Sequence, residues 1–247
     1  MIEMITNSNM YLILGEYWQN ILYTDGFRMT GVAMTLWLLI LSAVIGWVLS
    51  VFLAVARSSK KAYLRMPVWT FTYLFRGTPF YIQLLLIYNG VIFLEIVKET
   101  SVLKDFFRVG FNCAMLALVL NTAAYTTEII AGAIKNVGSG QIEAAQAYGM
   151  SRFQIYTRII LPTALRTSLP SYGNEVILLL HCTSLAFGAT VPELFSVIKQ
   201  INAKYLDSIN IYILAGCIYL VISYTLIALF RIAEKRWLSY LQPVSQH

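Results

Sequence analysis

The sequence predicts an all-α protein that crosses a membrane several times, and three observations support this fold class. Hydrophobic residues make up 58% of the 247 residues, while charged residues make up only 12%. The mean hydropathy is +0.67. Soluble domains are nearer half apolar and a quarter charged, so this chain has too few polar side chains to cover a water-facing surface. Long uncharged stretches, beginning with Val32 to Ala56, are long enough to cross a bilayer as helices.

Five stretches are predicted to span the membrane within one domain of residues 1–247. They lie at about 30–56, 67–94, 111–134, 169–190 and 209–230. The second contains Arg76-Gly77-Thr78-Pro79, where the proline removes a backbone donor and predicts a break in the helix. A break at membrane depth is tolerated only where protein or a watery cavity surrounds it. No cleavable signal peptide is expected, because the N-terminal tail is acidic rather than basic.

The lysines and arginines between these stretches predict the orientation of the chain. The loop after the first span, the loop between spans three and four and the C-terminal tail hold four, four and three of them. The opposite side holds one, three and two. Basic residues are enriched in cytoplasmic loops, which places the N-terminus outside and the C-terminus inside a bacterial inner membrane. Because the bases lie in short loops, the net charge of +6 does not indicate nucleic-acid binding.

The cytoplasmic loop at about residues 136–168 is predicted to form two short helices. Ser139 is a candidate N-cap of an alanine-rich helix, and Glu143 suits the positive end of its dipole. Gly149 fits a left-handed helix stop. Ser151 to Gln154 has capping-box spacing for the second helix, which Leu161-Pro162 is expected to end.

The residue types in these two helices are consistent with two different roles for the loop. Phe153, Tyr156 and Ile160 give the second helix an apolar side. The loop is then either a compact knob that sits in the groove of a partner or an amphipathic hairpin on the lipid surface. Both interpretations have similar weight at this point.

The loop resembles the EAA loop of permeases from bacterial ATP-binding-cassette (ABC) importers. Glu143-Ala144-Ala145, then Gly149, then Ile159, Leu161 and Pro162 match that pattern at every fixed position and spacing. The resemblance implies the type I importer permease fold, with the Glu143–Gly149 helix as the coupling helix that docks on an ATPase subunit.

Further motifs resemble the polar amino acid permeases within that family. Arg76-Gly77-Thr78-Pro79 followed by Gln83 is one, and the run from Asn121 to Glu128 is another. The resemblance covers about residues 31–238 and is nearest to the M-type permease of histidine/lysine/arginine/ornithine importers. Many relatives have Lys-Asp-Thr-Ser-Leu where this chain has His181-Cys182-Thr183-Ser184-Leu185, so an acidic residue that could hold a cationic cargo is absent at that position.

Polar residues inside the predicted spans fall into two layers. Arg76, Glu128 and Glu175 lie toward the inner side, with both glutamates about 9 Å from the inner ends of their spans. They are interpreted as either a structural ion-pair network or a gate. A second set lies near mid-depth, where transporters hold their cargo, and is the candidate substrate path. Its members are Asn121, His181, Thr183 and Ser184.

The sequence gives no sign of catalysis by this chain alone. It contains no phosphate-binding G-x-x-x-x-G-K-[ST] motif and no cluster with the spacing of metal ligands, so neither a cofactor nor a metal is expected. Cys113, Cys182 and Cys217 are interpreted as packing residues. The resemblance implies that ATP and Mg are bound by a partner ATPase homodimer.

The resemblance also implies the other partners and a transport cycle. A second, homologous permease would form a heterodimer around the cargo path, and a periplasmic binding protein would deliver a polar, basic amino acid. Two rivals remain: an ATP-independent channel or carrier, and an intramembrane enzyme that uses Glu128, Glu175 and His181. The first predicts transport without an ATPase, and the second predicts turnover by the purified chain.

Overall fold

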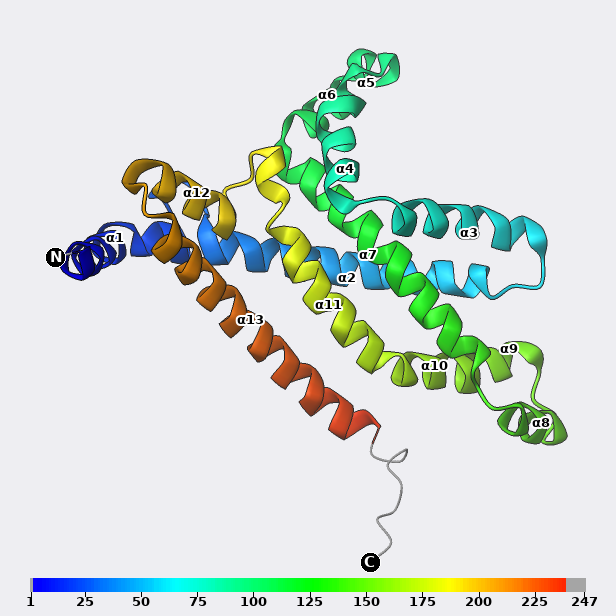
Figure 1. The fold of residues 1–247 in the computed structure, drawn as a ribbon. Coiled ribbons are helices and arrows are strands. Elements are labelled where there is room, and N and C mark those ends of the chain that lie inside the picture. The colour runs from blue at the N-terminus through cyan, green and yellow to red at the C-terminus, as the bar shows by residue number, and fades with distance from the viewer. Residues whose placement is uncertain (1, 239–247) are drawn as a thin grey trace, which may run out of the picture.

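The computed structural model describes residues 2–238, with the side chains of Tyr11 and of residues 13–238. The limits of the predicted domain, 1 and 247, therefore lie outside the described residues. The described chain is an elongated bundle of helices joined by short turns (Figure 1). In chain order the α-helices are α1 (Ile2–Leu22), α2 (Gly31–Arg57), α3 (Ala62–Gly77), α4 (Phe80–Leu85), α5 (Glu95–Glu99), α6 (Ser101–Arg108), α7 (Gly110–Lys135), α8 (Ser139–Ala147), α9 (Arg152–Ile155), α10 (Leu161–Thr167), α11 (Leu169–Thr183), α12 (Leu194–Tyr205) and α13 (Ser208–Trp237).

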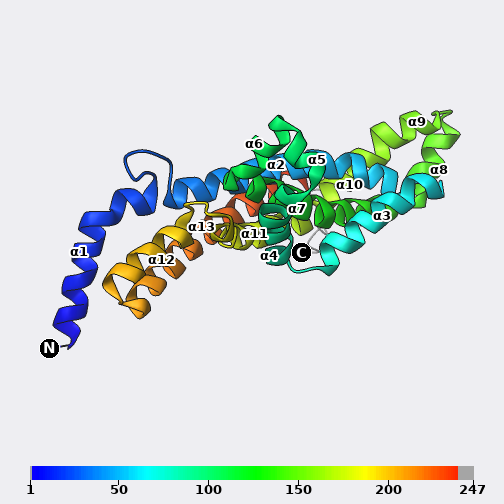
Figure 2. The same ribbon diagram turned by 90° about the horizontal axis from the view of Figure 1, so that it is seen from above.

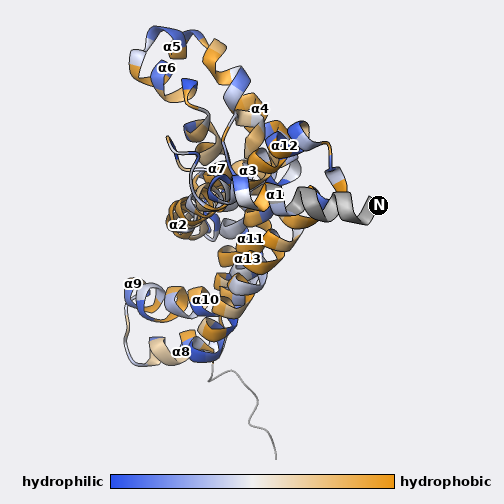
Figure 3. Ribbon diagram, turned by 90° about the vertical axis from the view of Figure 1, so that its left-hand side faces the viewer, coloured by the Kyte–Doolittle hydropathy of each residue, from blue (hydrophilic) through white to orange (hydrophobic). Residues whose placement is uncertain are grey.

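Three helices among residues 2–238 are long and apolar enough to cross a membrane. They are α2, α7 and α13, and they coincide with the first, third and fifth predicted spans. Only 6% of the apolar stretch of α13 is buried, as expected of a helix whose solvent is lipid. Polar residues gather on α5, α6, α8 and α9 at the ends of the molecule, and apolar residues dominate the helices between them (Figure 3).

Helices α2 and α7 pack closely because small residues recur on the buried side of α2. Ser42, Gly46, Ser50 and Ala54 are spaced four residues apart and are all buried. A Cβ atom at Gly46 would collide with the methyl group of Thr122 on α7. Small residues at such crossings let two backbones approach in a membrane, so this stripe fixes the crossing point.

The second and fourth predicted spans are both interrupted. The predicted break at Pro79 is present, since α3 ends at Gly77 and α4 begins at Phe80. After α4 the chain continues through a π-helical turn, Leu86–Gly90, and a 3-10 turn, Val91–Phe93. The α-helix of the fourth stretch is shorter than its predicted range of 169–190. It ends at Thr183, and a 3-10 turn, Ala186–Ala189, leads to Thr190 in a left-handed conformation (φ 60°).

Helix α1 is an element that the sequence analysis did not predict. Its buried Ile13 and Ile21 join Leu194 and Ile198 of α12 and Ile211 of α13 in a separate hydrophobic cluster. Figure 2 shows α1 running across the direction of α2 rather than along it. Tertiary packing, rather than an uninterrupted apolar run, therefore stabilises this helix.

The main hydrophobic core lies between α2, α4, α7 and α11. Its buried members include Leu38, Leu84, Leu118 and Leu180, one from each of these helices. This core holds the broken segment between α3 and α4 against α7 and α11. The arrangement places the polar residues of the break beside those of α7 and α11.

Candidate functional site

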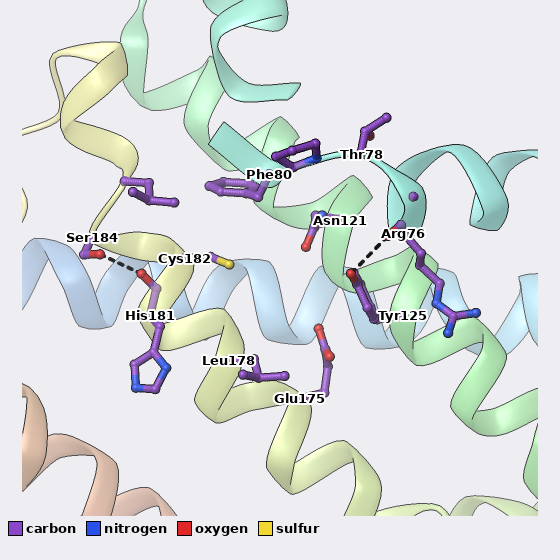
Figure 4. A pocket seen from close by; sticks show the side chains of 13 residues that line it. Arg76, Thr78, Phe80, Asn121, Tyr125, Glu175, Leu178, His181, Cys182 and Ser184 are labelled. Atoms are coloured by element: carbon purple, nitrogen blue, oxygen red, sulfur yellow. Dashed lines mark hydrogen bonds between the residues drawn. The ribbon is translucent and has the colours of Figure 1, made fainter. Parts of the chain in front are cut away.

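A cavity of about 590 Å³ lies where the break between α3 and α4 meets α7 and α11 (Figure 4). Arg76, Gly77, Thr78 and Pro79 line it from the break, and Asn121 and Tyr125 line it from α7. From α11 and the turn that follows, it is lined by Glu175, Leu178, His181, Cys182, Ser184 and Leu185. Three separate elements therefore contribute polar groups to one space at the middle of the bundle.

Gln83 stabilises the break between α3 and α4. Its side chain forms hydrogen bonds with backbone oxygens that lack helical partners at the break, where Pro79 has no N–H to donate. Its amide nitrogen donates to the carbonyl oxygens of Phe75 (2.7 Å) and Thr78 (3.0 Å). Its amide oxygen accepts from Asn121 Nδ2 at 3.2 Å, which ties the break to α7. Gln83 is buried, where an unpaired amide costs about 1–3 kcal/mol, so these bonds hold the cavity wall in place.

Arg76 is held at the cavity by Tyr125. The guanidinium carbon lies 5.4 Å from the centre of the Tyr125 ring, within range of a cation–π interaction. The Tyr125 hydroxyl donates to the backbone oxygen of Arg76 at 3.3 Å. The arginine charge therefore stays at the cavity, and no carboxylate among the described side chains lies within 4 Å of it.

The predicted inner layer of Arg76, Glu128 and Glu175 is divided in the structure. Arg76 and Glu175 line the cavity, but Glu128 does not. The carboxylate of Glu128 instead accepts from Arg57 Nε at 2.6 Å and from the Thr72 hydroxyl at 2.7 Å. These two contacts join the end of α2 and the second half of α3 to the C-terminal half of α7.

Arg57 is a functional partner that the sequence analysis missed, because it was counted only as a loop base. One feature of the sequence does point to this role: Arg57 comes directly after the uncharged stretch of the first span. A long basic side chain at such a helix end can reach back along the bundle toward a carboxylate. The interhelical pairing itself depends on the packing of α2 against α7.

Three of the four residues predicted for the substrate path reach the cavity. They are Asn121, His181 and Ser184. Thr183 is completely buried, and its hydroxyl donates to the backbone oxygen of Leu180 at 2.6 Å, as is common for threonine in a helix. Figure 4 shows the Glu175 carboxyl group pointing toward Tyr125, and the His181 ring pointing away from Asn121.

The predicted coupling residues lie on α8, on the turn after it and on the segment that leads to α10. Glu143 and Ala144 are exposed, whereas Ala145 is buried. Gly149 has φ +75°, the left-handed conformation that the sequence predicted. The backbone N–H of Met150 donates to the oxygen of Ala145 at 3.1 Å, which closes the end of α8 in a Schellman-type turn.

Two predicted details at the start of α8 are wrong. Ser139 is the first helical residue, the N-cap position belongs to Gly138, and no side-chain cap bond is formed. Glu143 lies in the middle of the helix, outside the first turn, where the helix dipole has little effect. The side chain of Glu143 is exposed and contributes little to the stability of α8 through the helix dipole.

The second loop helix begins as predicted but does not end at Pro162. Ser151 and Gln154 form a reciprocal capping box. A π-helical turn at Tyr156–Ile160 then leads directly into α10, with Pro162 in its first turn. The Leu161 N–H bonds to Tyr156, five residues back, and this wider turn accommodates a proline that would break a regular α-helix. Ile159, Leu161 and Pro162 are half-buried on this continuous segment.

Two exposed aromatic residues flank the Gly149 turn, and the sequence analysis did not single out Tyr148 at all. The side chains of Tyr148 and Phe153 are 90% and 76% exposed. Phe153 was expected on the apolar side of its helix, but Ile155 takes the buried position instead. A pair of exposed aromatics beside a tight turn is typical of the anchors of a protein interface.

The described residues contain no group of three or more histidine, cysteine or acidic side chains that could hold a metal ion. Of the three free cysteines, Cys113 is buried, Cys182 lines the cavity and Cys217 is exposed on α13. The polar side chains that line the cavity, among them Arg76, Asn121 and Glu175, can form hydrogen bonds and bind charged groups.

Comparisons with known proteins agree with this architecture. Residues 46–239 match the family described as the binding-protein-dependent transport system inner membrane component. The chain is 59% identical over 235 residues to the histidine/lysine/arginine/ornithine transport system permease protein HisM of Escherichia coli, covering 95% of this chain and 99% of that one. It is 43% identical to the nopaline transport system permease protein NocM of Agrobacterium fabrum, covering 85% and 87% of the two chains.

A solved structure supports the same fold. The crystal structure of an amino acid ABC transporter with histidines matches with a TM-score of 0.73 at 30% identity, covering 83% of this chain and 92% of that chain. The family match begins within α2 and includes the cavity and the whole coupling loop. This chain belongs to the family of binding-protein-dependent transport system inner membrane components.

Proposed function

We propose that the chain is a permease subunit of an ATP-driven importer for basic amino acids. It would form the cargo path with a second, homologous permease and couple through α8 to an ATPase homodimer that binds ATP and Mg. A periplasmic binding protein would deliver the amino acid to the opposite end of the path. The single observation that carries this proposal is the exposed EAA loop on a bundle whose central cavity is lined by Arg76, Asn121 and Glu175.

The shape of the loop supports docking on a partner rather than on lipid. Ala144 and Glu143 are exposed on α8, and Tyr148 projects from the turn that follows. A hairpin lying on a membrane surface would direct its large apolar residues to one side and keep carboxylates away from lipid. Here an acid and two aromatics surround a small-residue helix, which suits insertion into a protein groove.

The cavity charges support a basic amino acid as the cargo. Glu175 is buried on α11, forms no ion pair among the described residues, and lines the same cavity as Arg76. It lies two helical turns before Cys182, which occupies the position where many relatives have aspartate. We infer that Glu175 supplies the carboxylate for a cationic side chain, and that Arg76 faces the carboxylate of the cargo or acts as a gate.

Helix α7 provides a direct connection between cargo and energy. Asn121 and Tyr125 reach the cavity from its middle, and α8 follows its C-terminal end after a short turn. Movement of α8 by closing ATPase subunits would therefore displace the cavity wall. The Arg57–Glu128 pair would keep α2 and α3 attached to α7 during that movement.

The proposal is tested by uptake of labelled arginine into vesicles that contain the permease pair, the ATPase and the binding protein. We expect uptake that requires ATP and is lost in Glu143→Lys, because the charge reversal opposes docking of α8. Gln141→Lys is a matched control on the same helix and outside the EAA motif. Uptake without the ATPase would favour a carrier, and unchanged uptake by Glu143→Lys would remove α8 from the coupling role.

The role of His181 is tested in the same vesicles. We expect His181→Ala to change the apparent affinity or the selectivity among basic amino acids, because the residue lines the cavity at mid-depth. His181→Gln retains a polar side chain and serves as the comparison. Identical uptake kinetics of wild type and His181→Ala for histidine, lysine and arginine would show that His181 serves only in packing.

A further inference from the structure

A second cavity, of about 420 Å³, lies at the end of the bundle that carries the coupling loop. Its walls are the turn between α2 and α3, the first half of α3, and the last residue of α7. Figure 1 shows this turn on the same side of the molecule as α8 and α9. The cavity is separate from the central one and shares no lining residue with it.

The cavity is strongly basic. Arg57, Lys60, Arg65 and Lys135 all line it. Arg57 already pairs with Glu128, but the other three have no carboxylate within 4 Å in the described part of the chain. Three uncompensated positive charges around one cavity form an anion-binding site, since separated like charges gain stability from a shared anion.

The turn adds hydrogen-bonding groups to this charge. Ser58 and Ser59 both line the cavity. The Ser58 hydroxyl oxygen is inaccessible to solvent and has no hydrogen-bond partner among the described residues. Ser59 accepts from the backbone N–H of Lys61 at 3.2 Å, which fixes the turn. Because Ser58 and Ser59 both line the cavity, the turn places two hydroxyl-bearing residues beside the basic side chains.

The remaining wall is apolar and faces outward along α3. Met66 and Trp69 line the cavity and are 49% and 41% exposed. Trp69 stacks on Tyr73 one turn further along α3, with ring centres 5.2 Å apart. Tryptophan and tyrosine prefer the boundary between lipid tails and head groups, so this wall suits the glycerol and first acyl carbons of a lipid.

We propose that this cavity binds the phosphate head group of an anionic phospholipid of the adjacent leaflet. The site combines unpaired bases with an aromatic, apolar side at the end of membrane-spanning helices. Basic pockets between helices at a membrane surface are a recurring form of anionic lipid recognition. A free phosphate would use the bases but leave Met66 and Trp69 without a role.

A lipid at this position would bridge the α2–α3 connection and the end of α7 that leads into α8, and would reinforce the attachment that the Arg57–Glu128 pair provides. Lys135 ends α7, directly before the turn into α8, while Lys60 and Arg65 belong to the α2–α3 connection. A shared phosphate would therefore hold the base of α8 against α3. This effect on ATPase activity rests on the proposed function, whereas the lipid binding itself does not.

The test compares lipid retention by two triple variants. Lys60→Gln, Arg65→Gln and Lys135→Gln remove the free charges of the cavity, and Arg57 is left in place to keep its pair with Glu128. Lys98→Gln, Lys104→Gln and Arg108→Gln remove the same net charge at α5 and α6 as a matched control. The chain is extracted with its accompanying subunits, and bound phospholipid is identified by native mass spectrometry after addition of phosphatidylglycerol or phosphatidylcholine.

We expect wild type and the control variant to retain phosphatidylglycerol in preference to phosphatidylcholine. The cavity variant should bind it about a hundredfold more weakly, because each base near a membrane surface contributes about fivefold. ATPase activity in phosphatidylcholine vesicles should rise on addition of phosphatidylglycerol for wild type and not for the cavity variant. Far-ultraviolet circular dichroism and size-exclusion profiles equal to those of wild type establish that the cavity variant is folded.

Two other outcomes would overturn the lipid site, and a third would contradict only the proposed importer. Equal retention by the cavity and control variants would show that the lipid binds elsewhere. Displacement of phosphatidylglycerol by inorganic phosphate at equal concentration would identify a soluble anion site instead. Retention that depends on the cavity without any ATPase in the extract would leave the lipid site standing while contradicting the proposed importer.

Discussion

At the scale of single residues, Gln83 holds the break that forms one wall of the cavity. One buried amide bonds two backbone oxygens released by the break and also Asn121. The sequence motif that begins at Arg76 identified the break and included Gln83. The structure shows why an amide side chain is needed four residues after Pro79. The side chain replaces the helical partners that proline removes.

Gln83→Leu tests this role directly. We expect the melting temperature of the purified protein to fall, with a loss of about 1–3 kcal/mol in the free energy of unfolding for the unsatisfied carbonyl groups. Gln200→Leu, at an exposed position of α12, is the control and should be nearly neutral. Equal melting temperatures for Gln83→Leu and wild type would mean that water or a rearranged α4 satisfies the break.

The rotation of α11 about its axis decides which side chains of the predicted substrate path meet the cavity. Thr183 and Ser184 are neighbours, yet only Ser184 reaches it. A sequence gives the depth of a residue in a span but not its direction around the axis. That direction is set by the core contacts of Leu179 and Leu180, which turn Thr183 inward.

At the scale of elements, the coupling loop illustrates which local signals are reliable. The Gly149 stop and the Ser151 capping box form as predicted, because both depend only on backbone geometry within a few residues. The end of the second helix was predicted wrongly. A π turn accommodates Pro162, and such turns have no strong signature in sequence.

Two serines at the starts of α8 and α9 provide a matched pair of substitutions. Ser151→Ala should destabilise the start of α9 by about 1 kcal/mol, because it removes the bond to the Gln154 N–H. Ser139→Ala should have almost no effect, since Ser139 makes no cap bond. Hydrogen exchange of the amides in 152–156 measures the difference, and equal exchange in both variants would contradict the assigned capping box.

Helix α1 is attached through a polar cluster as well as through its apolar face. Glu16 accepts from the Tyr205 hydroxyl at 2.7 Å and from Lys204 Nζ at 3.0 Å. The Lys204 ammonium group also contacts the Tyr17 hydroxyl at 2.6 Å. The hydrogen bonds from Tyr205 and Lys204 lower the pKa of Glu16 below its usual value of 4.5, and the bonds to Tyr17 and Glu16 raise the pKa of Lys204.

This cluster predicts a dependence of α1 on pH. A carboxyl group with a lowered pKa in the folded state contributes stability above its unfolded pKa and loses it as pH falls through the folded value. We therefore expect the protection factors of the amides in residues 13–22, corrected for the intrinsic exchange rate at each pH, to fall as the pH decreases through and below 4.5. Glu16→Gln should abolish this change, and an unaltered pH profile in that variant would assign it to other groups.

At the scale of the whole molecule, composition predicted the fold class and the family resemblance predicted its arrangement. The apolar runs located α2, α7 and α13, since hydrophobic length alone defines such helices. Helix α1 was missed because its residues are of mixed polarity and become helical against α12 and α13. The Arg57–Glu128 pair was missed because its residues are far apart in the sequence.

The position of Cys182 has a practical consequence for following the transport cycle. Its thiol lines the central cavity, whereas Cys217 lies exposed on the apolar surface of α13 and Cys113 is buried. The native chain therefore carries its own chemical reporters. A charged, water-soluble alkylating reagent should modify Cys182 only in states whose cavity is open to the compartment that contains the reagent, while a lipophilic maleimide should prefer Cys217. Labelling from each side of a sealed vesicle, with and without nucleotide, would record the direction in which the cavity opens without any engineered substitution.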